Sequence, residues 1–237
     1  MRRRRMWILI GMVSGMVTAG LALLVMLVKH EPAFYLRAEV RSEQVRHQQA
    51  HEFMNRITDL FSRLNEHPAW SQEFTQEEIN SYFQDELFRD TKLIEIPDNV
   101  QAPRVSLEPD RLRVAFRYGS GLLSTMISID LRVWLVAKEP NVVALELCGF
   151  SAGRLPLGTR SLLDFISEAA REESIEVTWY RNGQHPVGLL RIQANQARPT
   201  FQLRRFEFQD GKLIIAGRSL TDAPAPPAKV ASTTPAR

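Results

Sequence analysis

Residues 111–135 read RLRVAFRYGSGLLSTMISIDLRVWL, and this stretch decides the fold. Apolar side chains alternate with arginines in residues 111–118, and Ile, Leu or Val occupies every second position of residues 127–135. Alternation with a period of two is typical of a β-strand that buries one face. Because Gly119-Ser120-Gly121 can turn the chain between the two runs, the stretch predicts a pair of antiparallel strands with one solvent-exposed face.

The chain beyond this pair repeats the same pattern in shorter runs. A strand is predicted at 142–147, and two hairpins are predicted at 175–192 and 201–216. Their turns contain Asn182-Gly183 and Asp210-Gly211, whose residues tolerate a positive φ. These runs extend the predicted antiparallel sheet toward the C-terminus.

Two helices are predicted to pack on this sheet. The first, over 75–88, begins with a capping box, because Thr75 can cap the helix and Glu78 can bond back to the capping residue. The second covers residues 159–172, and each helix carries its apolar side chains on one face. The predicted fold class is therefore α+β, with an antiparallel sheet packed on two amphipathic helices.

The N-terminal segment has the composition of a membrane span. Residues 6–28 contain no charged residue, and at about 1.5 Å of rise per residue they are long enough to cross a hydrocarbon core of about 30 Å. The arginines in residues 1–5 place that end in the cytoplasm by the positive-inside rule. The alternative, a cleaved signal peptide, is disfavoured because its apolar region is normally only about 7–15 residues long. The sequence predicts a single-pass signal anchor in the inner or plasma membrane, with an extracytoplasmic C-terminal domain.

The whole chain divides into five predicted parts. Residues 36–66 read as a helix that begins charged and then acquires an apolar stripe, which is typical of a stalk that docks on a domain. The end of the chain is rich in Ala, Pro, Ser and Thr without periodicity, which is typical of disorder. The parts are a cytoplasmic Arg-rich end at 1–5, a transmembrane helix at 6–28, a helical stalk at 29–69, an extracytoplasmic α+β domain at 70–221 and a disordered tail at 222–237.

Small residues recur every four positions in the predicted transmembrane helix, at Gly11, Gly15 and Ala19. This spacing leaves a shallow groove in which a second helix can approach closely. We interpret the three residues as packing positions for a homodimer formed through the transmembrane helix. The other partner expected for this segment is the membrane bilayer.

The charge balance excludes nucleic acid as an expected partner. Lys and Arg number 30 and Asp and Glu 27, but four of the basic residues lie in residues 2–5 and leave 26 for the rest of the chain. Binding to phosphates requires basic side chains clustered on one face, and a nearly neutral domain has no excess to supply them.

The sequence predicts neither an enzyme nor a cofactor or metal site. His47 and His51 are one helical turn apart, but no third ligand is in view, and a solvated helix face explains them better. Cys148 is the single cysteine and is interpreted as a small buried residue on a strand. His185 lies beside a hairpin turn, and the carboxylates show no paired spacing typical of general acid and base catalysis.

The capped helix and a later loop carry a resemblance to known families. Residues 74–83 read FTQEEINSYF, and residues 153–158 read GRLPLG between the strands and the second helix. In this order of elements, residues 70–217 resemble the YpmS-like and YceB-like families of anchored envelope proteins. The resemblance implies a tubular lipid-binding (TULIP-like) fold, in which a curved antiparallel sheet wraps a helix and leaves an apolar groove. The predicted spanning helix departs from the lipid anchor of YceB-like proteins.

The expected function is a membrane-anchored binding module that holds a lipid or other apolar ligand between sheet and helices in envelope maintenance. The same residues would line either a groove or a dry core, and a continuous apolar cavity of about 300 Å³ or more would distinguish the two. The alternative is a non-enzymatic envelope or secretion scaffold that binds protein partners through stalk and sheet, where Trp134 would be exposed. The candidate groove residues are Ile79, Phe83, Ile129, Leu131, Val133, Leu162 and Ile166.

Overall fold

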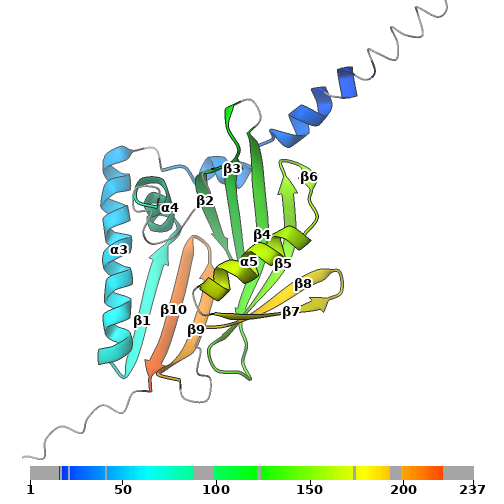
Figure 1. Ribbon diagram of the computed structural model, residues 1–237. Coiled ribbons are helices and arrows are strands. Elements are labelled where there is room, and N and C mark those ends of the chain that lie inside the picture. The colour runs from blue at the N-terminus through cyan, green and yellow to red at the C-terminus, as the bar shows by residue number, and fades with distance from the viewer. Residues whose placement is uncertain are drawn as a thin grey trace, which may run out of the picture.

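A computed structural model gives the fold of the chain, in which the described residues form two antiparallel sheets, the helices α2 to α5 and a helical run at residues 22–28 (Figure 1). The sheet-dominated α+β architecture is consistent with the sequence prediction. The structure describes residues 16, 18–20, 22–40, 42–87, 99–121, 124–172, 175–192 and 199–220.

The larger sheet contains the strand pair from which the fold was predicted, in the strand order β2-β3-β4-β5-β8-β7. A short strand, β6, pairs with β5 outside this path. The register of β3 and β4 joins Leu112 to Leu131 and Val114 to Ile129, so the alternating apolar residues share one face of the sheet. The strands are β2 (Val100–Glu108), β3 (Arg111–Tyr118), β4 (Thr125–Leu135), β5 (Val142–Ala152), β6 (Leu155–Pro156), β7 (Glu176–Asn182) and β8 (His185–Arg191).

The smaller sheet has the order β1-β10-β9 and is formed by β1 (Ala69–Thr75), β10 (Lys212–Ser219) and β9 (Phe201–Gln209). The C-terminal hairpin was predicted, and Gly211 has the positive φ of 71° that its turn requires. The sequence did not predict β1, which adds to the hairpin from a position far upstream in the chain.

The helices that accompany the sheets after residue 32 are α2 (Ala33–Arg37), α3 (Glu43–Glu66), α4 (Gln76–Asp85) and α5 (Arg160–Glu172) (Figure 1). The helix predicted over 36–66 is therefore two helices, because Ser42 caps α3 by accepting a hydrogen bond from the Val45 backbone N–H. The capping box predicted at Thr75 and Glu78 is present at the start of α4. The Glu78 carboxylate is buried and also pairs with Arg56 of α3 at 3.0 Å, which fixes α4 against α3.

One apolar core joins the two sheets and three of the helices. Its buried members include Trp70 and Phe74 from the small sheet, Leu131 from the large sheet and Leu162 from α5. Apolar side chains of α3 pack against the same cluster where the docking stripe was predicted, except for Phe61, which is 63% exposed. They are Phe53, Ile57, Leu60 and Leu64.

Two buried asparagine side chains bond to the backbone of a strand as a neighbouring strand would. Asn80 on α4 donates to the Val105 carbonyl at 2.9 Å and accepts from the Val105 N–H at 2.7 Å. Asn141, in the turn before β5, makes the same pair of bonds with the Phe201 carbonyl and the Leu203 N–H of β9, both at 2.7 Å. Backbone groups at the edge of a sheet are costly to bury unpaired, so these amides allow the strand edges to lie inside the molecule.

The prediction of a transmembrane helix over 6–28 is wrong for the chain that the structure describes. No helix among the described residues is long and apolar enough to cross a membrane. In this segment the structure describes a helical run at residues 22–28. This run ends against the domain, where the Leu27 carbonyl accepts from the Arg154 N–H at 2.9 Å and the Val28 carbonyl accepts from the Thr125 hydroxyl at 3.1 Å.

The predictions that depended on a spanning helix are therefore also wrong. These are the single-pass signal anchor and the location in an inner or plasma membrane with a cytoplasmic N-terminus. Of the packing positions proposed for a transmembrane dimer, Gly11 and Gly15 lie outside the described residues, and Ala19 is helical and exposed. The tail predicted at 222–237 also lies outside the described residues.

Candidate functional site

The seven predicted groove residues come together in the apolar core. Four of them are buried members of the main cluster: Ile79, Leu131, Val133 and Leu162. Phe83, Ile129 and Ile166 are half-buried and pack against it. The sequence therefore placed residues from α4, β4 and α5 in one neighbourhood.

An open hollow lies between the C-terminal half of α5 and the start of β7, and none of the seven predicted groove residues lines it. Its volume is about 320 Å³. Ile175 and Val177 contribute apolar side chains, and Glu168, Arg171 and Glu176 contribute charged ones. The hollow thus has an apolar part and a charged part.

The helix α5 is held to the sheet through β7. Trp179 donates its indole N–H to the Ser167 hydroxyl at 2.7 Å. The Trp179 ring lies over Gly188 of β8, where an added Cβ would be only 2.9 Å from the ring. Since Val177 is two residues before Trp179, it occupies the same face of β7 and also faces α5.

The apolar face of α5 is incompletely covered by the part of the chain that the structure describes. Leu162 and Ala170 are buried, whereas Leu163 and Ile166 are half-buried. Phe165 is 58% exposed. A strongly amphipathic helix normally buries its apolar stripe, so this helix retains apolar surface that a ligand could cover.

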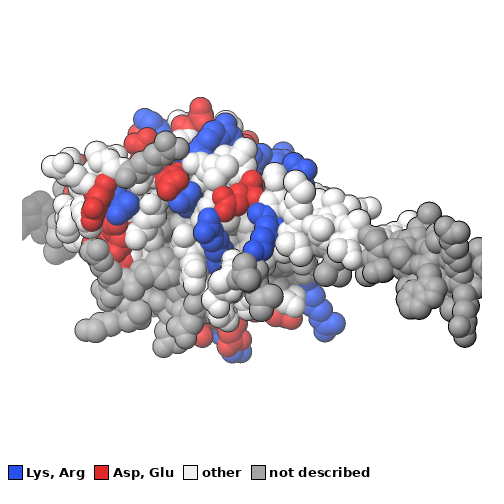
Figure 2. All heavy atoms as spheres, turned by 90° about the horizontal axis from the view of Figure 1, so that it is seen from above, with Lys and Arg blue, Asp and Glu red and all other residues white. Residues whose placement is uncertain are grey.

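The opposite, outer face of the large sheet is polar and carries a second hollow of about 280 Å³. Asp130 lines it and pairs with Arg111 at 3.0 Å, with Arg113 3.8 Å away. The residues that line it are Phe34, Arg113, Ser128, Ile129, Asp130, Gly149 and Ser151. Figure 2, which views the molecule from above Figure 1, shows basic and acidic side chains close together rather than in separate blocks.

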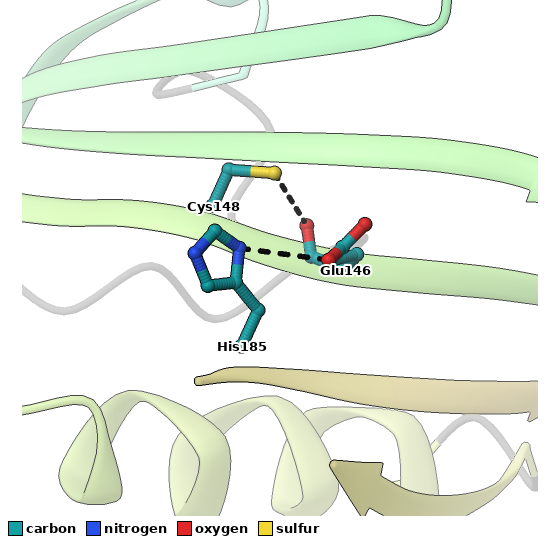
Figure 3. Close-up of side chains that lie close together, drawn as sticks. All are labelled: Glu146, Cys148 and His185. Carbon is teal, nitrogen blue, oxygen red and sulfur yellow. Dashed lines mark hydrogen bonds and ion pairs between the residues drawn. The ribbon is translucent and has the colours of Figure 1, made fainter. Parts of the chain in front are cut away.

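A compact group of three side chains lies further along this outer face. Glu146 and Cys148 belong to β5 and His185 begins β8, and their side chains gather at one place in the sheet (Figure 3). The potential ligand atoms of the three lie within 4.8 Å of one another. His185 Nδ1 is 3.5 Å from Glu146 Oε1, and the Cys148 thiol donates to the Glu146 backbone carbonyl at 3.8 Å.

The pairing of the strands explains why these residues meet. The ladder between β5 and β8 ends with Glu146 opposite Val187, and two further steps of the same register place Cys148 opposite His185. A shift of register between β4 and β5 also occurs here, between Asp130 and Leu131. Burial and the carboxylates of Glu146 and Asp130 raise the pKa of the Cys148 thiol above its ordinary value.

The sequence placed Cys148 on a strand and His185 beside a turn but did not bring them together. The signal that could have done so is the pairing of the predicted strand at 142–147 with the second half of the hairpin at 175–192, because a register would follow from it. His47, considered earlier with His51 for a metal, lies 2.8 Å from the buried Asp85 carboxylate instead. Trp134, expected to be exposed, is half-buried.

Comparison of the chain with family models, with curated proteins and with solved structures found no match.

Proposed function

We propose that the protein is a binding module for a small amphipathic molecule, held in the hollow between α5 and β7. The observation that carries this proposal is the hollow itself, whose lining includes the apolar side chains of Ile175 and Val177. Ligand pockets typically have volumes of about 300–1,000 Å³, so a hollow of about 320 Å³ suits a ligand with one chain.

The two kinds of lining residue indicate how such a ligand would lie. Ile175 and Val177 offer apolar contact to a hydrocarbon chain, and the half-buried Ile166 of α5 lies next to the lining residue Ser167. Transfer of apolar surface from water to these side chains would supply the affinity, at about 25 cal/mol per Å².

The charged rim matches a head group that carries both signs. Arg171 can pair with a phosphate, and Glu168 and Glu176 can pair with an ammonium group. Arg171 is already paired with Glu168, and Arg191 lies 3.7 Å from Glu176. The charged groups of the ligand would therefore replace these existing ion-pair partners. We therefore propose a single-chain zwitterionic lipid as the ligand class.

The test is a titration of the full chain with a fluorescent lysophosphatidylcholine. Val177→Asp places a carboxylate among the apolar side chains of the hollow, and we expect it to weaken binding at least about tenfold because the charge would need to be desolvated. Tyr180→Asp is the matched control, because Tyr180 lies on the other face of the same strand and is 56% exposed. We expect Tyr180→Asp to bind like the unsubstituted chain.

The proposal would be wrong if the unsubstituted chain did not bind the probe, or if the two substitutions weakened binding equally. Organic extraction of the natively purified protein, followed by mass analysis, gives an independent result. A stoichiometric lipid supports the proposal, whereas a stable protein without lipid and without affinity for the probe favours the protein-binding scaffold.

A further inference from the structure

We propose that Glu146, Cys148 and His185 form a binding site for a divalent transition metal, Zn²⁺ in the first place, on the outer face of the large sheet. The site is on the opposite face from the amphiphile hollow and does not depend on the function proposed for that hollow. Its three donors are a carboxylate oxygen, a thiolate sulfur and an imidazole nitrogen, and zinc binds each of these in proteins.

The distances fit a zinc site with small adjustments. In a tetrahedral site with metal–ligand bonds of about 2.0–2.3 Å, neighbouring ligand atoms lie about 3.4 Å apart. His185 Nδ1 and Glu146 Oε1 are already 3.5 Å apart, and all three ligand atoms lie within 4.8 Å. The His185 side chain is 45% exposed, so its ring is free to turn toward a bound ion.

The burial of Glu146 is an independent indication of a cation. This residue is only 6% exposed, and a buried carboxylate is costly unless it is well paired. Its polar partners among the described residues are distant: the Asn182 amide donates to Oε1 at 3.5 Å, His185 Nδ1 lies 3.5 Å from the same oxygen, and Arg132 lies 3.8 Å from Oε2. A metal ion between Oε1, the thiolate and the imidazole would compensate the buried charge directly.

The arrangement of the strands favours a rigid site. Glu146 and Cys148 are two residues apart on β5 and share its outer face, and His185 lies across from them at the start of β8 (Figure 3). Metal sites on strands are held more accurately than sites on loops. Three protein ligands leave a fourth position, which the exposed side of His185 opens to water or to a further ligand.

The proposal is tested by calorimetric titration of the full chain with Zn²⁺ and by the spectrum of the Co²⁺ complex. We expect one equivalent of Zn²⁺ to bind with a Kd of about 1 μM or tighter. We also expect an absorption band from a thiolate–Co²⁺ bond, because Cys148 is the single cysteine of the chain. Cys148→Ser should abolish that band, and His185→Gln should weaken Zn²⁺ binding at least about tenfold.

His51→Gln is the control, since His51 is an exposed histidine of α3 that is not part of the group. Thermal unfolding of each variant establishes whether it is folded. If Cys148→Ser does not fold, the Zn²⁺ affinity of His185→Gln tests the proposal alone. The proposal is overturned if no stoichiometric binding occurs, if the Co²⁺ complex lacks the thiolate band, or if His51→Gln weakens binding as much as His185→Gln.

Discussion

Replacing Asn80 with alanine would remove the amide that joins α4 to the edge of β2. Asn80 is 1% exposed, and it bonds both the N–H and the carbonyl of Val105. After the substitution both backbone groups would remain buried without these partners. An unsatisfied buried polar group costs about 1–3 kcal/mol, so we expect Asn80→Ala to lower the free energy of unfolding by about 2–6 kcal/mol.

Two further substitutions turn this expectation into a graded series. Gln76 bonds β2 only once, by accepting from the Leu107 N–H at 2.8 Å, so Gln76→Ala should cost about 1–3 kcal/mol. Gln48 makes an exposed bond with Glu52 on α3, and Gln48→Ala should cost less than about 0.5 kcal/mol.

The assay for this series is urea unfolding of the full chain followed by circular dichroism, with the slope compared between variants to ensure a common unfolded state. The expected order of destabilisation is Asn80→Ala, then Gln76→Ala, then Gln48→Ala. The reasoning is refuted if Asn80→Ala costs less than about 1 kcal/mol, or if the exposed Gln48→Ala costs as much.

Three other results are expected. Burial raises the pKa of Tyr35, so the stability that its protonated phenol contributes is complete below pH 10 and is lost as the pH rises through the higher folded-state pKa. In urea unfolding, the stability advantage of the unsubstituted chain over Tyr35→Phe should therefore shrink above pH 10, and a stability difference that stays constant with pH would contradict this. Gly217→Ala would place a Cβ 2.4 Å from the Trp70 ring and should destabilise the fold by about 1–3 kcal/mol in the same assay. Gly158→Ala is the control: no atom lies within 4 Å of its added Cβ, so it should change stability by less than about 0.5 kcal/mol. Because the pKa of Cys148 is raised, its reaction with a thiol reagent in the presence of a chelator should be slower at pH 8 than that of free cysteine, and it should accelerate at higher pH. Equal reaction rates of Cys148 and free cysteine at pH 8 would argue against the raised pKa.

The elements that the sequence predicted are those with a strong local signal. The alternation in residues 111–135, the capping box at Thr75 and the Asp210-Gly211 turn each depend on neighbours in the chain, and all three are present in the structure. The division into two sheets depends instead on distant partners. Asn80 and Asn141 substitute for neighbouring strands, and no local pattern distinguishes such an asparagine from one in an ordinary turn.

The same reason limited the prediction of the sites. The groove residues follow from apolar periodicity, so the sequence could place them on the core side of their elements. The group formed by Cys148 and His185 requires the pairing of β5 with β8 and its register, because 36 residues separate the two in the chain. Hydropathy also predicted a spanning helix at the N-terminus, whereas no helix among the described residues is long and apolar enough to cross a membrane.

Hydrogen–deuterium exchange of the full chain, with and without lysophosphatidylcholine, tests the proposed binding site most directly. We expect the ligand to slow exchange in α5 and in residues 175–182 of the β7 region, and to leave exchange in α3 unchanged. Equal exchange with and without the lipid, or protection confined to other elements, would contradict binding between α5 and β7.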